Sequence, residues 1–473
     1  MCIHWRTPRL GDARQSNLIV LGNFGAYSSL ATMGTRVVFQ RRRETDSLLN
    51  DEPSEDPYFI AKLFGMAFIS GGNSGYALNS VGFVLARLVR DAPEPLPEGL
   101  IGSIAYCGIF IGCPLGGLLA RRVGRRVATL YGELMIIFAC VVGAIGGPAT
   151  VPLVFWRLLV GVGVGICITV KPLYLAELSP DEHRGKILAG MGVANALSVM
   201  GAHTVDYIAD GGSGSLGWWW RFEALSGAFL PVFLLLLLRH MPESPVYLAA
   251  AVAASEDAEE DVAESKRLAT VRWKSIGLCV ALDVVRECTG GPVVSTYAKQ
   301  IYMGLRADDD PASLDLAYGL ATIGCFVVGN AATFLLVDRV GRRPPLLMGC
   351  AGVALAMGVF SVAGSPAALV FFGLGFGGIF ATWTILLPEL LLPRDRARLI
   401  GWLMALPFVF SLAEVYSYPL FAARRQLSRA AFASFAIIAA VLGGVLHSTL
   451  PETLGVPLGK LWDKAADDAE PKA

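Results

Sequence analysis

Twelve apolar stretches of about 20 residues run through this chain of 473 residues, and each is long enough to cross the roughly 30 Å hydrocarbon core of a bilayer. Backbone groups find no partners in lipid, so a span must be a helix or part of a closed barrel. Leu- and Gly-rich runs of this length are too long for barrel strands. The sequence therefore predicts an all-α polytopic membrane protein. The expected spans are 59–85, 99–120, 127–147, 151–173, 186–208, 218–240, 273–298, 314–337, 345–364, 366–391, 399–421 and 430–450.

Composition supports this prediction and excludes several functions. Apolar residues make up 54% of the chain and charged residues 16%, whereas soluble domains carry about 25% charged residues. No basic patch of the kind that binds nucleic acid is present, and no nucleophile, metal or phosphate-loop constellation indicates an enzyme. The nine cysteines form neither a CxxC pair nor a Cys/His cluster, so we expect no metal site and no cofactor.

Arginines and lysines indicate the orientation of the spans. Short basic loops follow spans two, four, eight and ten, which places them on one side if both termini are cytoplasmic. A basic cluster at 424–429, after span eleven, departs from the rule. We expect a cytoplasmic tail at 1–57, a six-helix bundle at 58–240, a cytoplasmic loop at 241–272, a second bundle at 273–450 and a tail at 451–473.

The first 57 residues leave some alternatives open. Residues 15–35 form a weakly apolar stretch that is either part of a plain cytoplasmic tail, which we favour, or a further membrane helix. An arginine-rich, acid-poor start also fits a transit-like segment. Residues 44–49 match an acidic dileucine pattern, so the expected location is the plasma membrane or an endosomal or lysosome-like membrane.

Three motifs occur twice in the same order, about 210 residues apart. Val-Gly-Arg-Arg at 123–126 recurs at 340–343. A glutamate followed seven residues later by an arginine occurs at Glu177 and at Glu389. Pro-Glu-Ser at 242–244 recurs as Pro-Glu-Thr at 451–453. Two parallel six-helix repeats around a site at the membrane midplane are a transporter plan.

These motifs resemble those of the sugar porter branch of the major facilitator superfamily. The similarity is carried by segments 117–126, 172–185, 242–245, 338–343 and 451–455, and it covers nearly all of 58–460. It implies twelve helices in two pseudo-repeats and transport by alternating access. It also implies that ion pairs at the cytoplasmic helix ends form a gate that opens and closes. The implied gate residues are Arg122, Arg125, Arg126, Arg157, Glu177, Arg184, Glu243, Asp338, Arg339, Arg342, Glu389, Arg396 and Glu452.

Arg121 departs from the family pattern. Sugar porters carry an acid at this position, facing the positive end of a helix from the other half, and that dipole repels an arginine. We expect a weaker gate and a more populated inward-facing state.

Span seven holds the densest group of intramembrane charges, Asp283, Arg286 and Glu287, and such charges are usually functional. Asp283 lies one helical turn from both others, so an Asp283–Arg286 pair is open to it. The resemblance places Arg286 and Glu287 where sugar porters have glutamines. A charged or zwitterionic solute fits these replacements; the alternative is that the three charges neutralise each other and brace the helix. The full set of expected substrate residues is Asn73, Ser74, Asn195, Asp283, Arg286, Glu287, Thr296, Tyr297, Trp383 and Glu414.

Asn73 bears on the mode of transport. Proton-coupled relatives carry an acid at this position in span one, and facilitators a neutral residue, so the resemblance favours passive transport. The expected function is transport of a small sugar or sugar-like solute by a protein that works as a monomer. Its partners are that solute and the lipid bilayer. The alternatives are a proton-coupled carrier of a charged organic solute, with Glu287 or Glu414 as the proton site, and a nutrient sensor that binds solute without moving it.

Overall fold

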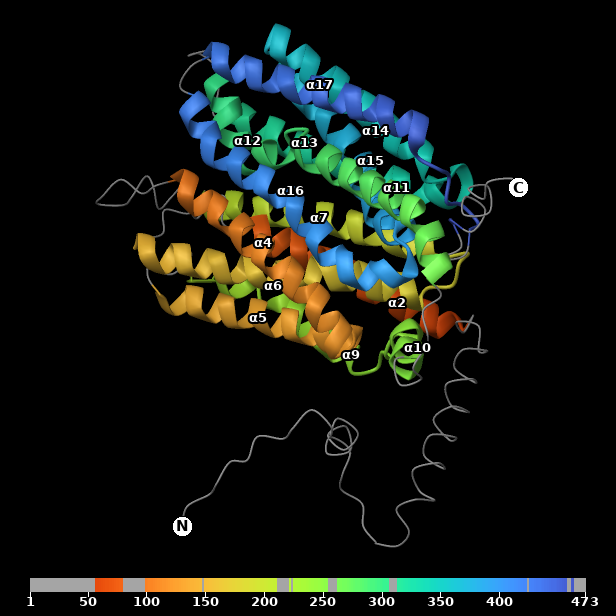
Figure 1. Ribbon diagram of the computed structural model, residues 1–473. Helices are drawn as coiled ribbons and strands as arrows, with labels where there is room; N and C mark the ends of the chain where they lie inside the picture. Colours follow the sequence, from red (N-terminus) through yellow and green to blue (C-terminus); the bar gives the residue numbers. More distant parts are fainter. Residues whose placement is uncertain are drawn as a thin grey trace, which may run out of the picture. The chain divides into compact units, whose positions relative to one another are not determined.

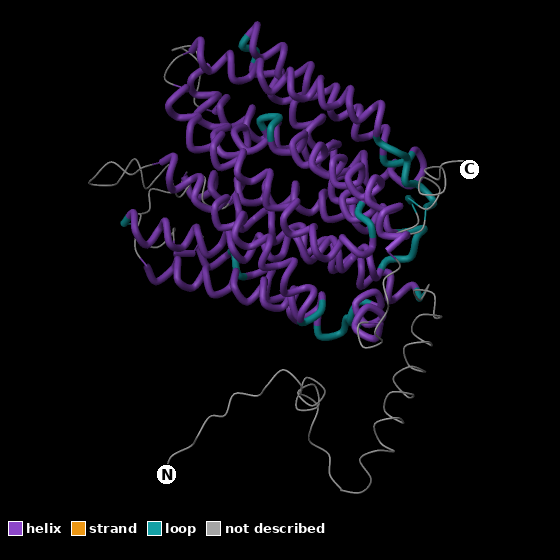
Figure 2. The backbone as a smooth tube through the Cα atoms, viewed as in Figure 1, coloured by secondary structure: helices purple, strands orange, loops and turns teal. Residues whose placement is uncertain are grey.

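The computed structural model describes residues 56–79, 98–146, 149–210, 221–222, 224–253, 262–305, 313–422, 425–456 and 461–462. All regular structure in these ranges is helical, and Figure 2 shows helices joined by short turns. The apolar stretch at 15–35 and the dileucine pattern at 44–49 lie outside the described residues.

Helices occupy the positions expected of the spans. The first half contains α2 (Pro57–Asn79), α4 (Glu98–Arg122), α5 (Arg125–Gly146), α6 (Thr150–Leu178), α7 (Arg184–Asp210) and α9 (Phe229–Leu238). A short helix, α10 (Pro245–Ala253), leads to the second half. That half contains α11 (Val262–Glu287), α12 (Gly291–Leu305), α13 (Ser313–Val340), α14 (Arg343–Ala363), α15 (Pro366–Leu390), α16 (Pro393–Ala422) and α17 (Arg425–Thr449). Within the described ranges, nine helices are long and apolar enough to cross a membrane.

Contacts between helices repeat in the two halves (Figure 1). In the first half α4 packs on α6, α6 on α5 and α5 on α9. In the second half α13 packs on α15, α15 on α14 and α14 on α17. The halves meet where α4 contacts α16 and where α7 contacts α13, which are equivalent places in the two repeats. The fold is therefore the expected pair of parallel six-helix repeats.

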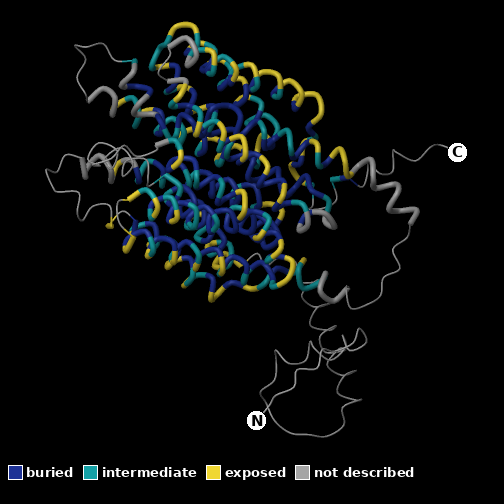
Figure 3. Tube along the Cα trace, turned by 60° about the vertical axis from the view of Figure 1, so that its left-hand side comes forward, coloured by how far each residue is buried: buried dark blue, intermediate teal, exposed yellow. Residues whose placement is uncertain are grey.

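The distribution of buried and exposed side chains is that of a membrane protein. Figure 3 shows buried residues between the helices and exposed residues along their outer faces. Large apolar side chains such as Phe138 and Leu355 are exposed, as expected where the neighbours are lipid chains. Between helices, Gly112 of α4 permits close approach, because a Cβ there would overlap the carbonyl oxygen of Val162 in α6.

Span seven differs from the expectation. The sequence predicts one continuous helix over 273–298, whereas α11 ends at Glu287 and α12 begins at Gly291. Gly290 between them has a φ of 87°, a conformation that favours glycine. Pro292 then lies in the first turn of α12, where its missing N–H costs nothing. The break leaves the charged end of α11 inside the protein, as in other transporters with interrupted helices.

Candidate functional site

A cavity lies between the two halves, with walls from α2, α4, α6 and α7 on one side and from α11, α12, α13, α15 and α16 on the other. Its volume is about 130 Å³, on a measure by which one water needs about 10–15 Å³, so it has room for roughly ten non-hydrogen atoms. Four expected substrate residues line it: Ser74, Asn195, Arg286 and Glu287. Aromatic rings form much of the remaining wall: Tyr106, Phe326, Phe372, Phe376, Phe380 and Phe408.

Arg286 is held tightly at this wall. Its guanidinium pairs with the carboxylate of the adjacent Glu287. The guanidinium carbon lies 3.9 Å from the ring centroid of Trp383 and 5.1 Å from that of Phe408. Such cation–π contacts stabilise a cation that has lost its water. Glu287 also accepts a hydrogen bond of 2.5 Å from Ser411 of α16, so α11 and α16 fix the charge pair together.

Asp283 does not pair with Arg286 as the spacing allowed. It accepts a hydrogen bond of 2.6 Å from the indole nitrogen of Trp383. Asp283 and Trp383 are both buried and stand behind Arg286 rather than lining the cavity. They therefore support the position of the arginine.

The other expected substrate residues also lie away from the cavity wall. Tyr297 donates a hydrogen bond of 2.8 Å to the carbonyl of Val415 and stacks on Tyr418. Thr296 and Glu414 are half-buried. Asn73 is buried and turns towards α5, where its amide donates to Glu133.

In the first half, the expected gate residues form a compact brace. Arg125 donates two hydrogen bonds to Glu177, of 2.9 and 3.1 Å, and Ser244 donates to the same carboxylate. Glu243 accepts from the backbone N–H groups of Arg125, at 2.8 Å, and Arg126, at 3.1 Å. Gly124 has a φ of 94°, and a Cβ there would collide with Glu243. The Gly-Arg-Arg turn is therefore shaped around a carboxylate.

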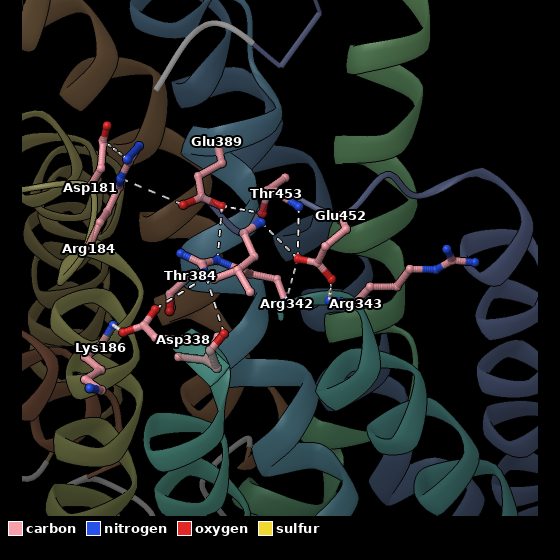
Figure 4. Close-up of polar contacts among 12 residues, drawn as sticks. Asp181, Arg184, Lys186, Asp338, Arg342, Arg343, Thr384, Glu389, Glu452 and Thr453 are labelled. Atoms are coloured by element: carbon pink, nitrogen blue, oxygen red, sulfur yellow. Dashed lines mark hydrogen bonds and ion pairs between the residues drawn. The ribbon is translucent and has the colours of Figure 1, made fainter. Parts of the chain in front are cut away.

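The second half repeats this brace. Glu452 accepts from the backbone N–H groups of Arg342, at 2.9 Å, and Arg343, at 3.1 Å. Arg342 lies 3.7 Å from the Glu389 carboxylate, which accepts a hydrogen bond of 2.6 Å from Thr453 (Figure 4). Gly341 has a φ of 100°, and a Cβ there would collide with Glu452. The duplicated motifs thus build duplicated structure.

Contacts across the interface join the two braces. Arg184 of α7 lies 3.9 Å from Glu389 of the second half. Asp338 accepts from the backbone N–H of Lys186, at 3.2 Å, at the start of α7 (Figure 4). Arg396 of α16 is buried beside the cluster and donates a hydrogen bond of 3.1 Å to the carbonyl of Leu391 in its own half. Burial lowers the pKa of Arg396 to about 10. Arg396 therefore stays charged at neutral pH.

Three expected gate residues stand apart from this cluster. The side chains of Arg122 and Arg339 are exposed. Arg157 requires a correction: it lies twenty residues before Glu177 on α6, or about 30 Å away. It donates instead to the carbonyl of Leu78 at the other end of α2, so it is not part of the gate cluster.

The family model described as Sugar (and other) transporter matches residues 71–271 and 250–462, which is more than half of the chain. The chain belongs to the sugar transporter family. Members of this family are transporters and not enzymes, and the protein is a multi-pass integral membrane protein.

Individual relatives of this sugar transporter family member agree with the assignment. The major myo-inositol transporter IolT of Bacillus subtilis is 26% identical over 77% of this chain and 85% of that protein. The putative metabolite transport protein YfiG of the same organism is 26% identical over 58% of this chain and 62% of that protein. Among solved structures, the proton:xylose symporter XylE bound to 6-bromo-6-deoxy-D-glucose gives a TM-score of 0.72 at 19% identity, covering 86% of this chain and 99% of that one. This last likeness shows the fold.

The structure of this transporter also reveals polar groups that the sequence analysis missed. Glu133 of α5 and Lys171 of α6 form an ion pair of 2.5 Å with neither side chain exposed. Both are charges inside expected spans, Glu133 alone in its span and Lys171 together with Arg157, and this was the available signal. Ser244 and Thr453, which bond the brace glutamates, belong to motifs already noted but had no assigned role.

Proposed function

We propose that the protein carries a small polyhydroxylated solute, a monosaccharide or a cyclic polyol, across a membrane by alternating access. The observation that carries this proposal is a cavity whose walls come from both halves. Rocking of one half against the other would expose such a cavity on one side of the membrane and then on the other. Family membership and the myo-inositol transporter among the relatives support this solute class.

The charges at the wall favour a solute without net charge. Arg286 and Glu287 compensate each other, so the cavity offers an adjacent donor and acceptor rather than a single unbalanced charge. Ser74 and Asn195 add neutral hydrogen-bonding groups from the opposite half. Hydroxyl groups of a sugar or polyol can use both kinds of partner, and the flat phenyl rings suit the apolar faces of a sugar ring.

We assign the gate cluster to the cytoplasmic side, with both termini there, because the basic loops gather at that end. Contacts of Arg184 and Asp338 between the halves support the proposal that these residues form the gate and that it is closed in this structure. We propose passive transport by a monomer in the plasma membrane or an endosomal or lysosome-like membrane. Asn73, which is neutral, supports the passive mode.

Uptake into proteoliposomes tests the function. Purified protein should equilibrate radiolabelled D-glucose, D-xylose or myo-inositol without concentrating it. Asn195→Ala should raise the half-saturation concentration about fivefold, because loss of one hydrogen bond costs about 1 kcal/mol. Ser434→Ala, at an exposed position on α17, is the matched control and should leave uptake unchanged. Binding without uptake of any probe would contradict transport and support a sensor.

The charge pair needs its own test. If Arg286 and Glu287 bind solute, Arg286→Gln combined with Glu287→Gln should reduce uptake by at least about tenfold, while the protein still unfolds cooperatively. Uptake that survives this double neutralisation would show that the pair braces α11 and does not contact solute.

A further inference from the structure

Glu133 and Lys171 form a charge pair at the interface of three helices of the first half. The Lys171 ammonium lies 2.5 Å from one carboxylate oxygen of Glu133, and the exposed fraction of both side chains is 0%. The other oxygen accepts a hydrogen bond of 2.5 Å from the amide of Asn73 in α2. Cys167, one turn before Lys171 on α6, lies 3.4 Å from Glu133 and completes the surroundings.

Close packing of α5 on α6 produces this arrangement. Gly132 has no side chain, and a Cβ there would lie 2.6 Å from the sulfur of Cys167. The neighbouring Glu133 is thereby brought against the face of α6 that carries Lys171. The pair is a product of this helix packing and lies about two helical turns from Arg125 on α5 and from Glu177 on α6.

The pair stands directly behind the wall of the cavity. Asn73 precedes Ser74, which lines the cavity, and Cys167 precedes Ile168, which also lines it. The carboxylate of Glu133 therefore contacts one residue of α2 and one of α6 that each directly precede a cavity-lining residue. Its charge state acts on the helices that form the first-half wall.

A carboxyl group that is fully buried away from water adopts one of two protonation states. It takes up a proton, or an opposite charge at close range keeps it ionised. The groups that face Glu133 are Lys171 and Cys167 from α6 and the uncharged amide of Asn73 from α2. Helix α9 contains no titratable residue, and the charged residues of α4, which are Glu98, Arg121 and Arg122, lie at the two ends of that helix. Lys171 is therefore the group that decides the state of Glu133.

We propose that Lys171 is a fixed counter-charge that keeps Glu133 ionised throughout the transport cycle, and that Glu133 is a latent proton-binding site exposed when Lys171 is lost. The proposal rests on the passive transport proposed above and names the residue that makes it independent of protons. The step in the variant is simple protonation, in which the carboxylate binds one proton from water and becomes a neutral carboxyl group.

A stability measurement tests the proposal without any solute. In Lys171→Met the folded protein should hold a proton on Glu133 that the unfolded chain has released above about pH 5. The folded state then binds more protons than the unfolded state, so stability falls as pH rises. The unfolding midpoint in detergent should drop by about 3–5 °C between about pH 6 and about pH 8.5 relative to wild type.

Two further variants separate a proton site from a general packing effect. Glu133→Gln combined with Lys171→Met removes both charges and should restore the flat pH profile of wild type. Lys171→Arg keeps the charge and should also stay flat. Equal pH profiles for Lys171→Met and the double variant would overturn the proposal.

Transport provides the second readout. Exchange of radiolabelled D-glucose, D-xylose or myo-inositol by wild type and the double variant should be independent of pH. Exchange by Lys171→Met should fall at least about fivefold between about pH 6 and about pH 8.5, as an unpaired buried carboxylate forms. Accumulation of a probe by wild type along an imposed pH gradient would contradict the proposal. If wild type moves none of the probes, the proposed function fails, and the stability profiles alone decide the role of Lys171.

Discussion

The two halves of the gate share an inner brace but differ where each meets its neighbour. Arg125, Glu177 and Glu243 of the first half correspond to Arg342, Glu389 and Glu452 of the second. Asp338 then bonds the start of α7 across the interface. The equivalent residue of the first half is Arg121, which is exposed. The repeats have therefore kept the contacts inside each half and lost symmetry in the contacts between them.

This difference divides the interface into a stronger and a weaker corner. A carboxylate at a helix start is stabilised by the helix dipole, and an arginine is repelled. The α7–α13 corner has the carboxylate, whereas the α4–α16 corner has the arginine. We expect the cytoplasmic side to begin opening between α4 and α16.

The largest expected effect concerns the shared braces. Glu177→Gln and Glu389→Gln each leave a buried arginine without its carboxylate, which should cost about 3–5 kcal/mol of unfolding free energy. Denaturant unfolding of the purified variants measures both losses. If the two losses of unfolding free energy differ by more than about 2 kcal/mol, the two braces do not contribute equally to stability.

A smaller effect is expected at the stronger corner. Asp338→Asn removes the negative charge at the start of α7 and should favour the inward-facing state by about 1 kcal/mol. A Ser179→Cys reporter, at a position that is now buried beside the gate, measures this opening in a background without the native cysteines. Its reaction with a water-soluble maleimide should accelerate about fivefold. An unchanged rate would show that Asp338 does not hold the gate.

The opposite change is expected at the weaker corner. Arg121→Asp should stabilise the closed gate by about 0.3–1 kcal/mol and slow the same reporter about two- to fivefold. Arg122→Asp, at the adjacent exposed position, is the matched control for a change of surface charge. Equal slowing in both variants would remove the special role of position 121.

The smallest effect is expected at Arg157. Since it lies about 30 Å from Glu177, Arg157→Lys should leave the reporter rate within about a factor of two of wild type. A larger change would show that Arg157 does act on the gate.

Much of the fold was predictable because its signals are local and repeated. Apolar runs of membrane length mark the spans, and the second copy of each motif marks the repeat. The break in span seven was not predicted, since residues 273–298 have the length of one membrane span. Gly290, Gly291 and Pro292 are residues that favour a break and could have indicated it. The partner of Arg286 was also missed, because α11 ends at Glu287 and its last side chain is free to fold back.

The candidate site shows a different limit. The sequence identifies charges that are costly in a membrane, and Glu133 and Lys171 could have been noted by that criterion although they were missed. Their meeting depends on the rotation of α5 against α6, which is set by packing at residues such as Gly132. Spacing along one helix cannot supply that angle between two helices. Arg157 was misplaced for a related reason, since the family motif names a residue but not its depth in the membrane.

The interruption of span seven has a mechanical consequence. Gly290 forms a joint above the anchored charge pair, and Tyr297, with a φ of −116°, adds a second joint within α12. A segment of 15 residues hinged in this way can tilt over a loaded solute while α11 stays attached to α16. We expect capture of a solute and release of the opposite gate to be separate movements, each with its own barrier.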